Sequence, residues 1–183
     1  MEYNMTIHAM IDLETLDVSP TAQVLSIGGV KFNPNTKEEP FDEFFYRVDI
    51  DIQESTGRTV STETLDWWST QDKDAIEMAF SPDGRISPQE MLRHLKKWYV
   101  GCDTVWSQRI LMDVAIIQNM CKQYEVPVAW PYWGVKDSAT LFGILPDDPR
   151  KAYTFLKHDP LQDAKFQAKA VQDAIIGLGL TIR

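Results

Sequence analysis

The sequence predicts an α/β fold in which helices cover a mixed β-sheet. Three early segments, residues 7–12, 24–32 and 41–48, have the apolar runs or the alternation of strands and are close enough along the chain to form an antiparallel unit. Beyond residue 62, helical periodicity alternates with short apolar runs, as in layered α/β folds. A chain of 183 residues suffices for one domain that buries roughly 70% of its unfolded surface, so we expect residues 1–183 to form a single domain.

The first half of the chain alternates apolar segments with polar connections. A turn rich in Asp, Ser and Pro separates the first two strands, and residues 49–61 are polar with few apolar anchors, which predicts a connection. Residues 62–79 have a helical pattern that breaks near Gln71. The sequence Ser-Pro-Asp-Gly at 81–84 is typical of a turn.

The second half begins with the clearest helix start in the chain. Ser87 can cap the helix, Pro88 suits the first helical position, and Glu90 stands three residues after the cap, so we expect a helix to about Tyr99. The elements expected after it are a strand at 104–107, a helix that ends before Pro127, a strand at 133–136, a short helix around Leu141 and a long helix from Pro160 to about Leu178.

The composition is that of a soluble globular protein, with 44% hydrophobic and 25% charged residues. No apolar run is long enough to span a bilayer, and the acidic start Met-Glu-Tyr-Asn lacks the basic region of a signal peptide. We therefore expect no membrane association and a cytoplasmic location. Cys102 and Cys121 have no second ligand at metal-binding spacing, which disfavours a zinc site and a disulfide framework.

The net charge of −9 argues against a protein that coats nucleic acid through a general basic surface. From Arg150 onward, basic residues outnumber acidic ones, so the excess of acid lies in the first 149 residues. Carboxylates that must converge are usually held by divalent cations, whose charge the formal count omits. The acidity is therefore compatible with a metal-dependent enzyme that acts on phosphates.

Two acidic residues stand at the end of the first strand. Asp12 and Glu14 are two residues apart, and the period of a strand directs both side chains to the same face. Like charges at this spacing repel unless a cation or a shared proton lies between them. The pair is compatible with a metal site and also with a solvated strand end.

The stretch from His158 to Asp163 opens the terminal helix. Asp159 is a suitable N-cap and Pro160 suits the first helical position. His158 then flanks the cap and Asp163 lies one turn in, at the two positions that touch in a hydrophobic staple. Alone, this is an ordinary capped helix with two polar side chains.

A further acid, Asp113, stands in the first turn of the helix that follows the strand at 104–107. The helix dipole favours an acid there in any protein. The short strand, however, leads toward the edge where Asp12 and Glu14 emerge. Together with Asp163, four carboxylates from three elements and one histidine form a constellation that chance rarely supplies.

In order and spacing, Asp12-Leu-Glu14, Asp113 and His158-x-x-x-x-Asp163 resemble the motifs of the DEDDh exonucleases, also called DnaQ-like. The resemblance covers nearly the whole chain and implies a ribonuclease H-like fold, with the first three strands antiparallel. Within the family, the chain is most similar to small phage-type 3′–5′ exodeoxyribonucleases and to bacterial exoribonucleases that favour adenylate-containing RNA.

One feature departs from the family. Ser107, Gln108 and Met112 stand where Asn and Phe are common before the third acid.

The resemblance implies a 3′–5′ exonuclease that hydrolyses single-stranded RNA or DNA from the 3′ end and releases nucleoside 5′-monophosphates. Its four acids, Asp12, Glu14, Asp113 and Asp163, would hold two Mg²⁺ ions, for which Mn²⁺ substitutes, and Asp12 would bridge them. Carboxylate oxygens suit these hard cations. His158 would accept the proton of the attacking water, because the ordinary pKa of an imidazole is near 6.5.

Substrate contacts are expected beside these ligands. By resemblance, Leu13 and Thr15 would meet the terminal nucleotide. Trp67 and Trp68 are about 100° apart on a helix, so one is expected in the core while the other stacks on a base or lies in a dimer interface. Both could also be packing residues.

Charge for phosphates is expected from Lys151 and Lys157, although lysines on a solvated surface need no function. The remaining tryptophans are expected to be packing residues: Trp98, Trp106, Trp130 and Trp133.

Two alternatives stay open. One is a catalytically inactive module of this fold that binds nucleic acid or protein. The other is a structural divalent-ion site, although a calcium loop would place its ligands in one contiguous segment. The family suggests a homodimer, and the choice between RNA and DNA depends on contacts to the 2′-OH that the sequence does not locate.

Overall fold

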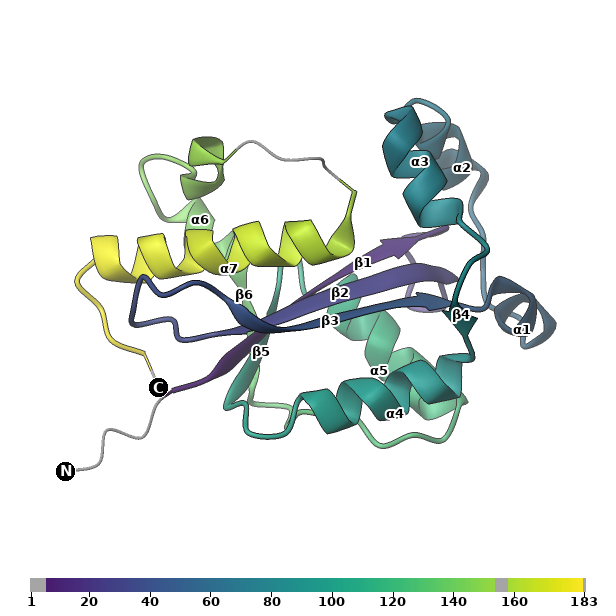
Figure 1. The fold of residues 1–183 in the computed structure, drawn as a ribbon, viewed down its shortest axis with the longest axis horizontal. Helices are drawn as coiled ribbons and strands as arrows, with labels where there is room; N and C mark the ends of the chain where they lie inside the picture. The colour runs from purple at the N-terminus through teal and green to yellow at the C-terminus, as the bar shows by residue number, and fades with distance from the viewer. Residues whose placement is uncertain (1–5, 154–157, 183) are drawn as a thin grey trace.

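The computed structural model describes residues 6–153 and 158–182, within which six strands form one mixed sheet (Figure 1). Their order across the sheet is β4-β3-β2-β1-β5-β6. β1, β2 and β3 pair antiparallel, whereas β5 runs parallel to β1 and β6 runs parallel to β5, so the predicted mixed sheet is confirmed. The strands are β1 His8–Thr15, β2 Val24–Phe32, β3 Phe41–Val48, β4 Arg85–Ile86, β5 Thr104–Ser107 and β6 Val135–Asp137.

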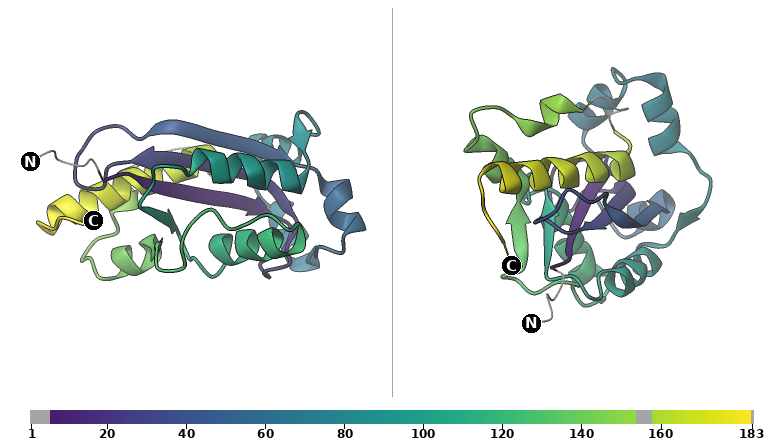
Figure 2. Two further views of the ribbon diagram at one scale, coloured as in Figure 1. Left: turned by 90° about the horizontal axis from the view of Figure 1, so that it is seen from below. Right: turned by 60° about the vertical axis from the view of Figure 1, so that its left-hand side comes forward.

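Helices pack on both faces of the sheet. α7 covers one face while α4 and α5 cover the other (Figure 2), and α2 and α3 lie beyond the end of β1, beside the start of α7 (Figure 1). Among the described helices, none has the length and apolar character needed to cross a bilayer. The helices are α1 Ile50–Ser55, α2 Thr62–Trp68, α3 Lys73–Phe80, α4 Pro88–Trp98, α5 Asp113–Gln123, α6 Ser138–Gly143, the 3-10 helix Pro149–Ala152 and α7 Pro160–Gly177.

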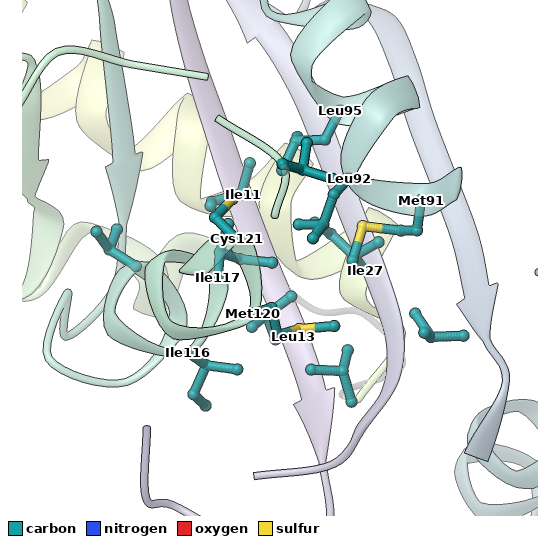
Figure 3. Packing of buried hydrophobic residues seen from close by; sticks show 14 of the residues in the cluster. Ile11, Leu13, Ile27, Met91, Leu92, Leu95, Ile116, Ile117, Met120 and Cys121 are labelled. Atoms are coloured by element: carbon teal, nitrogen blue, oxygen red, sulfur yellow. The ribbon is translucent and has the colours of Figure 1, made fainter. Parts of the chain in front are cut away.

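The alternation of β1 separates a hydrophobic core from the acidic edge. Ile11 and Leu13 point into the core between the sheet and helices α4 and α5, where they meet Leu92 and Ile117 (Figure 3). Met10 belongs to the second core, under α7. Because successive side chains in a strand alternate between faces, Asp12 and Glu14 share the α7 face with Met10. Burial of each large apolar side chain contributes about 1.5–3 kcal/mol and fixes this orientation of β1.

Two predictions about the first half of the chain were wrong. Residues 49–61 contain α1, capped by the Asp49 side chain. Its anchor is the buried amide of Gln53, which accepts from the Val24 N–H and donates to the Val24 carbonyl. A count of apolar residues does not detect such a polar anchor. The first strand also runs three residues beyond the predicted end, to Thr15.

The remaining elements agree with prediction to within two residues. The helical pattern at 62–79 breaks near Gln71, where α2 and α3 separate. β6 begins at Val135 rather than at Trp133. Trp133 itself is 72% exposed, so its expected packing role was wrong, whereas Trp106 and Trp130 are buried.

Candidate active site

Three predicted carboxylates converge where β1 passes under the start of α7. Asp12, Glu14 and Asp163 each offer a carboxylate oxygen, and these three oxygens lie within 4.8 Å of one another. Two of them come from β1 and the third from the first turn of α7, more than a hundred residues later. This is the spacing at which oxygens of separate side chains can share a cation.

The start of α7 reaches the sheet because Gly28 leaves room for it. Gly28 on β2 is paired with Asp12, and a Cβ at position 28 would overlap the backbone of Pro160 and Leu161. The helix is capped as predicted: the Asp159 carboxylate accepts from the Leu161 and Gln162 N–H groups. The helix cap at Asp159 and the absence of a side chain at Gly28 together hold the first turn of α7, and therefore Asp163, over Asp12.

His158 lies at the edge of this cluster. Its backbone N–H donates to Oδ2 of Asp163 at 2.9 Å, so the expected pair across the cap does meet, but through the backbone of His158. Nδ1 of its ring lies 3.8 Å from Oε1 of Glu14, and the edge of the ring meets Trp67 at 4.8 Å between centroids. His158 has a φ of 67°, a conformation that L side chains seldom adopt. Such strain is characteristic of functional positions.

Asp113 comes from α5, the helix that packs on the face of the sheet opposite α7. It is the first residue of α5, 4% exposed, and its Oδ1 accepts a hydrogen bond of 3.2 Å from the N–H of Leu13, the residue between the two strand ligands. Burial raises the pKa of Asp113 to about 7, although the Leu13 N–H opposes the shift. It is not one of the three residues whose carboxylate oxygens lie within 4.8 Å of one another, but it lines the same cavity.

The electrostatic environment of the carboxylate cluster favours a bound cation. Burial, followed by the charges of Asp113, Asp163 and Glu14, holds the pKa of Asp12 well above its ordinary value. Burial, followed by the charges of Asp163, Asp113 and Asp159, raises the pKa of Glu14 well above its ordinary value. Without a compensating cation, ionising these carboxyls is unfavourable, and a divalent ion reverses that balance. The donor set therefore fits Mg²⁺ or Mn²⁺.

The cluster opens into a cavity of about 720 Å³. Trp67, Arg109 and Lys151 line it together with the four acids and His158. An adjoining cavity of about 360 Å³ is mostly apolar. Its lining includes Leu13, Thr15, Val18, Thr64, Trp67 and Met112.

The two neighbouring tryptophans separate as expected. Trp68 is buried and its Nε1 donates to the Thr15 carbonyl, whereas Trp67 is 43% exposed and borders both cavities. Lys151 is exposed at the rim of the larger cavity, and Lys157 lies outside the described residues. Arg150 is paired with Asp148 at 2.6 Å.

The sequence interpretation assigned no role to Gln167, which the structure places in the site. Its Nε2 donates to Oδ1 of Asp12 at 2.9 Å. The sequence contained one indication of this placement: Gln167 is four residues after Asp163 and thus lies on the same helical face.

Comparison with known proteins identifies the family of this chain. Residues 7–175 match the model of the Rv2179c-like 3′-5′ exoribonuclease domain. The chain belongs to this family. The resemblance to 3′-5′ exonucleases that was inferred from the sequence motifs is confirmed.

Solved nucleases share the ribonuclease H-like fold at low sequence identity. The nuclease domain of 3′hExo, a DEDDh family member bound to rAMP, is 14% identical with a TM-score of 0.63, over 100% of this chain and 96% of that one. Cell-death related nuclease 4 (CRN-4) is 14% identical with a TM-score of 0.65, over 96% of this chain. E. coli exonuclease I in complex with a dT13 oligonucleotide is 9% identical with a TM-score of 0.63, over 93% of this chain.

The chain spans 65% of the length of CRN-4 and 41% of that of exonuclease I. No curated protein matches the sequence at a significant level.

Proposed function

We propose that residues 1–183 act as one exonuclease domain that shortens single-stranded RNA from its 3′ end and releases nucleoside 5′-monophosphates. The convergence of Asp12, Glu14 and Asp163 within 4.8 Å, in a cavity that is open to solvent, carries the proposal. RNA is favoured because the family model describes an exoribonuclease and the 3′hExo domain binds rAMP.

The four acids would hold two Mg²⁺ ions, or Mn²⁺ in their place. When bound, such ions lower the pKa of the attacking water and neutralise the charge that develops on the phosphate. Asp113 braces β1 through the Leu13 N–H, so the strand ligands keep their spacing. Asp163 is held by the cap of α7 and by the His158 N–H.

His158 would accept the proton of the attacking water. Its ring contacts Glu14 and Trp67 and lines the larger cavity. The backbone N–H of His158 stays on Asp163, which links the ring to the ligand cluster. Glu14 and Trp67 thus limit the directions in which the imidazole can face.

The apolar cavity would receive the terminal nucleoside. Leu13 and Thr15 line it beside Glu14, and the partly exposed ring of Trp67 offers a surface on which a base can stack. Trp68 contributes indirectly, because its Nε1 fixes the carbonyl of Thr15.

The test is shortening of 5′-labelled RNA and DNA oligonucleotides of the same sequence, each with Mg²⁺, Mn²⁺ or EDTA. We expect a ladder of 3′-shortened products with either metal, faster on RNA, and none with EDTA. Shortening that favours DNA would reassign the substrate. Binding without shortening under any metal would instead establish the inactive module.

Replacing His158 with Ala is expected to lower kcat by about 10²–10⁴-fold, the range for loss of a general base. Binding of the divalent ion, measured by calorimetry, should change little because the imidazole is not among the proposed ligands. His94→Ala is the matched control, since His94 lies outside both site cavities. Near-full turnover by the His158 variant would refute the general-base role.

Replacing Lys151 with Gln is expected to weaken RNA binding by an amount that depends on salt. If Lys151 contacts one phosphate, the slope of log affinity against log salt concentration should become shallower by about 0.7. Fluorescence anisotropy on a labelled RNA, in Ca²⁺ or EDTA to prevent cleavage, measures the slope. Lys73→Gln on α3, whose lysine pairs with Glu77, should leave it unchanged.

The family also suggests a homodimer, and the composition a cytoplasmic location; both stay predictions. Sedimentation equilibrium of the purified chain tests the first.

A further inference from the structure

Gln167 contacts the carboxylate cluster, but the proposed reaction assigns it no role. It lies one helical turn after Asp163, is 7% exposed, and lines the cavity that holds the acids. Resting on the proposed function, we infer that Gln167 is a positioning residue of the cation site. It holds one oxygen of Asp12 through Nε2 and offers Oε1 to the water molecules around the bound cation.

The hydrogen bond to Asp12 shows which way the amide faces. The NH₂ end of Gln167 is the end that can donate to a carboxylate oxygen, and it faces Asp12. The observed hydrogen bond, 2.9 Å from Nε2 to Oδ1, has this orientation. Oε1 is then directed away from Asp12.

Oε1 of Gln167 is a buried acceptor that has no hydrogen-bond partner within the described part of the chain. Buried acceptors are normally satisfied, and one that lacks a partner in a functional cavity points to a donor that arrives with a ligand. Mg²⁺ retains several water molecules when carboxylates bind it, and those waters donate hydrogen bonds. A neutral amide oxygen accepts from them without adding another negative charge to the cluster.

The hydrogen bond from Gln167 also restricts rotation of the Asp12 carboxylate. Asp12 faces Glu14, Asp113 and Asp163, and the repulsion between them favours turning its carboxylate away. The Gln167 hydrogen bond opposes this rotation and leaves the other oxygen of Asp12 for the cation. Hydrogen bonds that orient metal ligands typically account for about 10–100-fold in metal affinity.

A purely structural role for Gln167 makes a different prediction, and Gln172 provides the comparison. Gln172 is a second buried glutamine on α7, and its Nε2 donates to the carbonyls of Asn33 and Glu38, which join the helix to the loop between β2 and β3. Loss of this amide removes two hydrogen bonds at a distance from the carboxylates. Gln172→Met therefore measures what a lost buried amide does to stability alone.

The experiment compares Gln167→Met, Gln172→Met and the unaltered chain without nucleic acid. Mn²⁺ binding is followed by the electron paramagnetic resonance signal of the free ion, with Asp12→Asn identifying the site. Thermal unfolding in EDTA reports folding, and Gln167→Leu supplies a second apolar variant of similar size. The Mn²⁺ dependence of RNA cleavage is measured on the same proteins.

We expect both Gln167 variants to bind Mn²⁺ about 10–100-fold more weakly, whereas Gln172→Met unfolds at a lower temperature and binds Mn²⁺ normally. The midpoint of Mn²⁺ activation should shift by the same factor, and saturating Mn²⁺ should restore most of kcat. Normal Mn²⁺ affinity in the Gln167 variants would overturn this inference and leave the proposed function standing. Absence of any Mn²⁺ binding that Asp12→Asn removes would overturn both.

Discussion

Replacing Asp12 with Asn is expected to abolish RNA shortening while preserving the fold. Asp12 is the carboxylate on which the charges of Glu14, Asp113 and Asp163 all act, and it is one of the proposed ligands of the ions. Loss of several kcal/mol of transition-state stabilisation corresponds to a rate reduction of about 10³-fold or more. Single-turnover cleavage at saturating Mg²⁺ measures the effect.

The same substitution should stabilise the protein in EDTA. A carboxyl whose pKa is raised on folding binds its proton more tightly in the folded state, so the chain with Asp12 loses stability as pH rises above the ordinary value near 4. Asn at this position removes that dependence. We expect a higher Tm for Asp12→Asn at pH 8 and a smaller difference at pH 5.

The effect of Mg²⁺ on the Tm and a control variant, Asp66→Asn, further test the role of Asp12. Mg²⁺ should raise the Tm of the unaltered chain and have little effect on Asp12→Asn, because only a folded site binds the ion. Asp66→Asn, on the exposed face of α2, should behave as the unaltered chain in every assay. Cleavage by Asp12→Asn at an undiminished rate would contradict the proposed ligand set.

Much of the fold was predictable because its signals are local. The bounds of β2, β3 and β5 agree with the apolar runs, and α4 begins at the predicted cap, Ser87. What the sequence did not predict depends on tertiary contacts. β4 has only two residues and forms because Arg85 pairs with β3 and donates to the carbonyl of Val48.

The candidate site also contains some residues that local patterns predict and others that depend on tertiary contacts. Asp12 and Glu14 follow from strand alternation, and Asp163 follows from the helix cap, so their shared location needed only the order of the elements. The role of Gln167 depends on which turn of α7 lies over which residue of β1, and no local pattern encodes that register. The close approach at Gly28 was indicated in the sequence, since a glycine inside an apolar strand indicates the close approach of another backbone.

Replacing Gly28 with Ala is expected to damage the site from a position that touches no substrate. The added methyl group would overlap the backbone of Pro160 and Leu161, so the first turn of α7 must move away from β2. Overpacking of this kind costs about 1–3 kcal/mol of stability. Asp163 and Gln167 move with the helix, and a displacement of about 1 Å at a reacting centre can lower the rate about 10²-fold.

The neighbouring glycine separates the two effects. Gly29 faces the opposite side of the sheet, where a Cβ would meet Cη2 of Trp98 at 3.0 Å and the Met10 carbonyl at 3.1 Å. Gly29→Ala should therefore lower the Tm through crowding under α4 while kcat and Mn²⁺ affinity stay near normal. Gly28→Ala should lower all three, because the helix that it displaces carries Asp163. Equal losses of kcat in the two variants would show that strand packing in general, rather than the seat of α7, controls the geometry of the carboxylates.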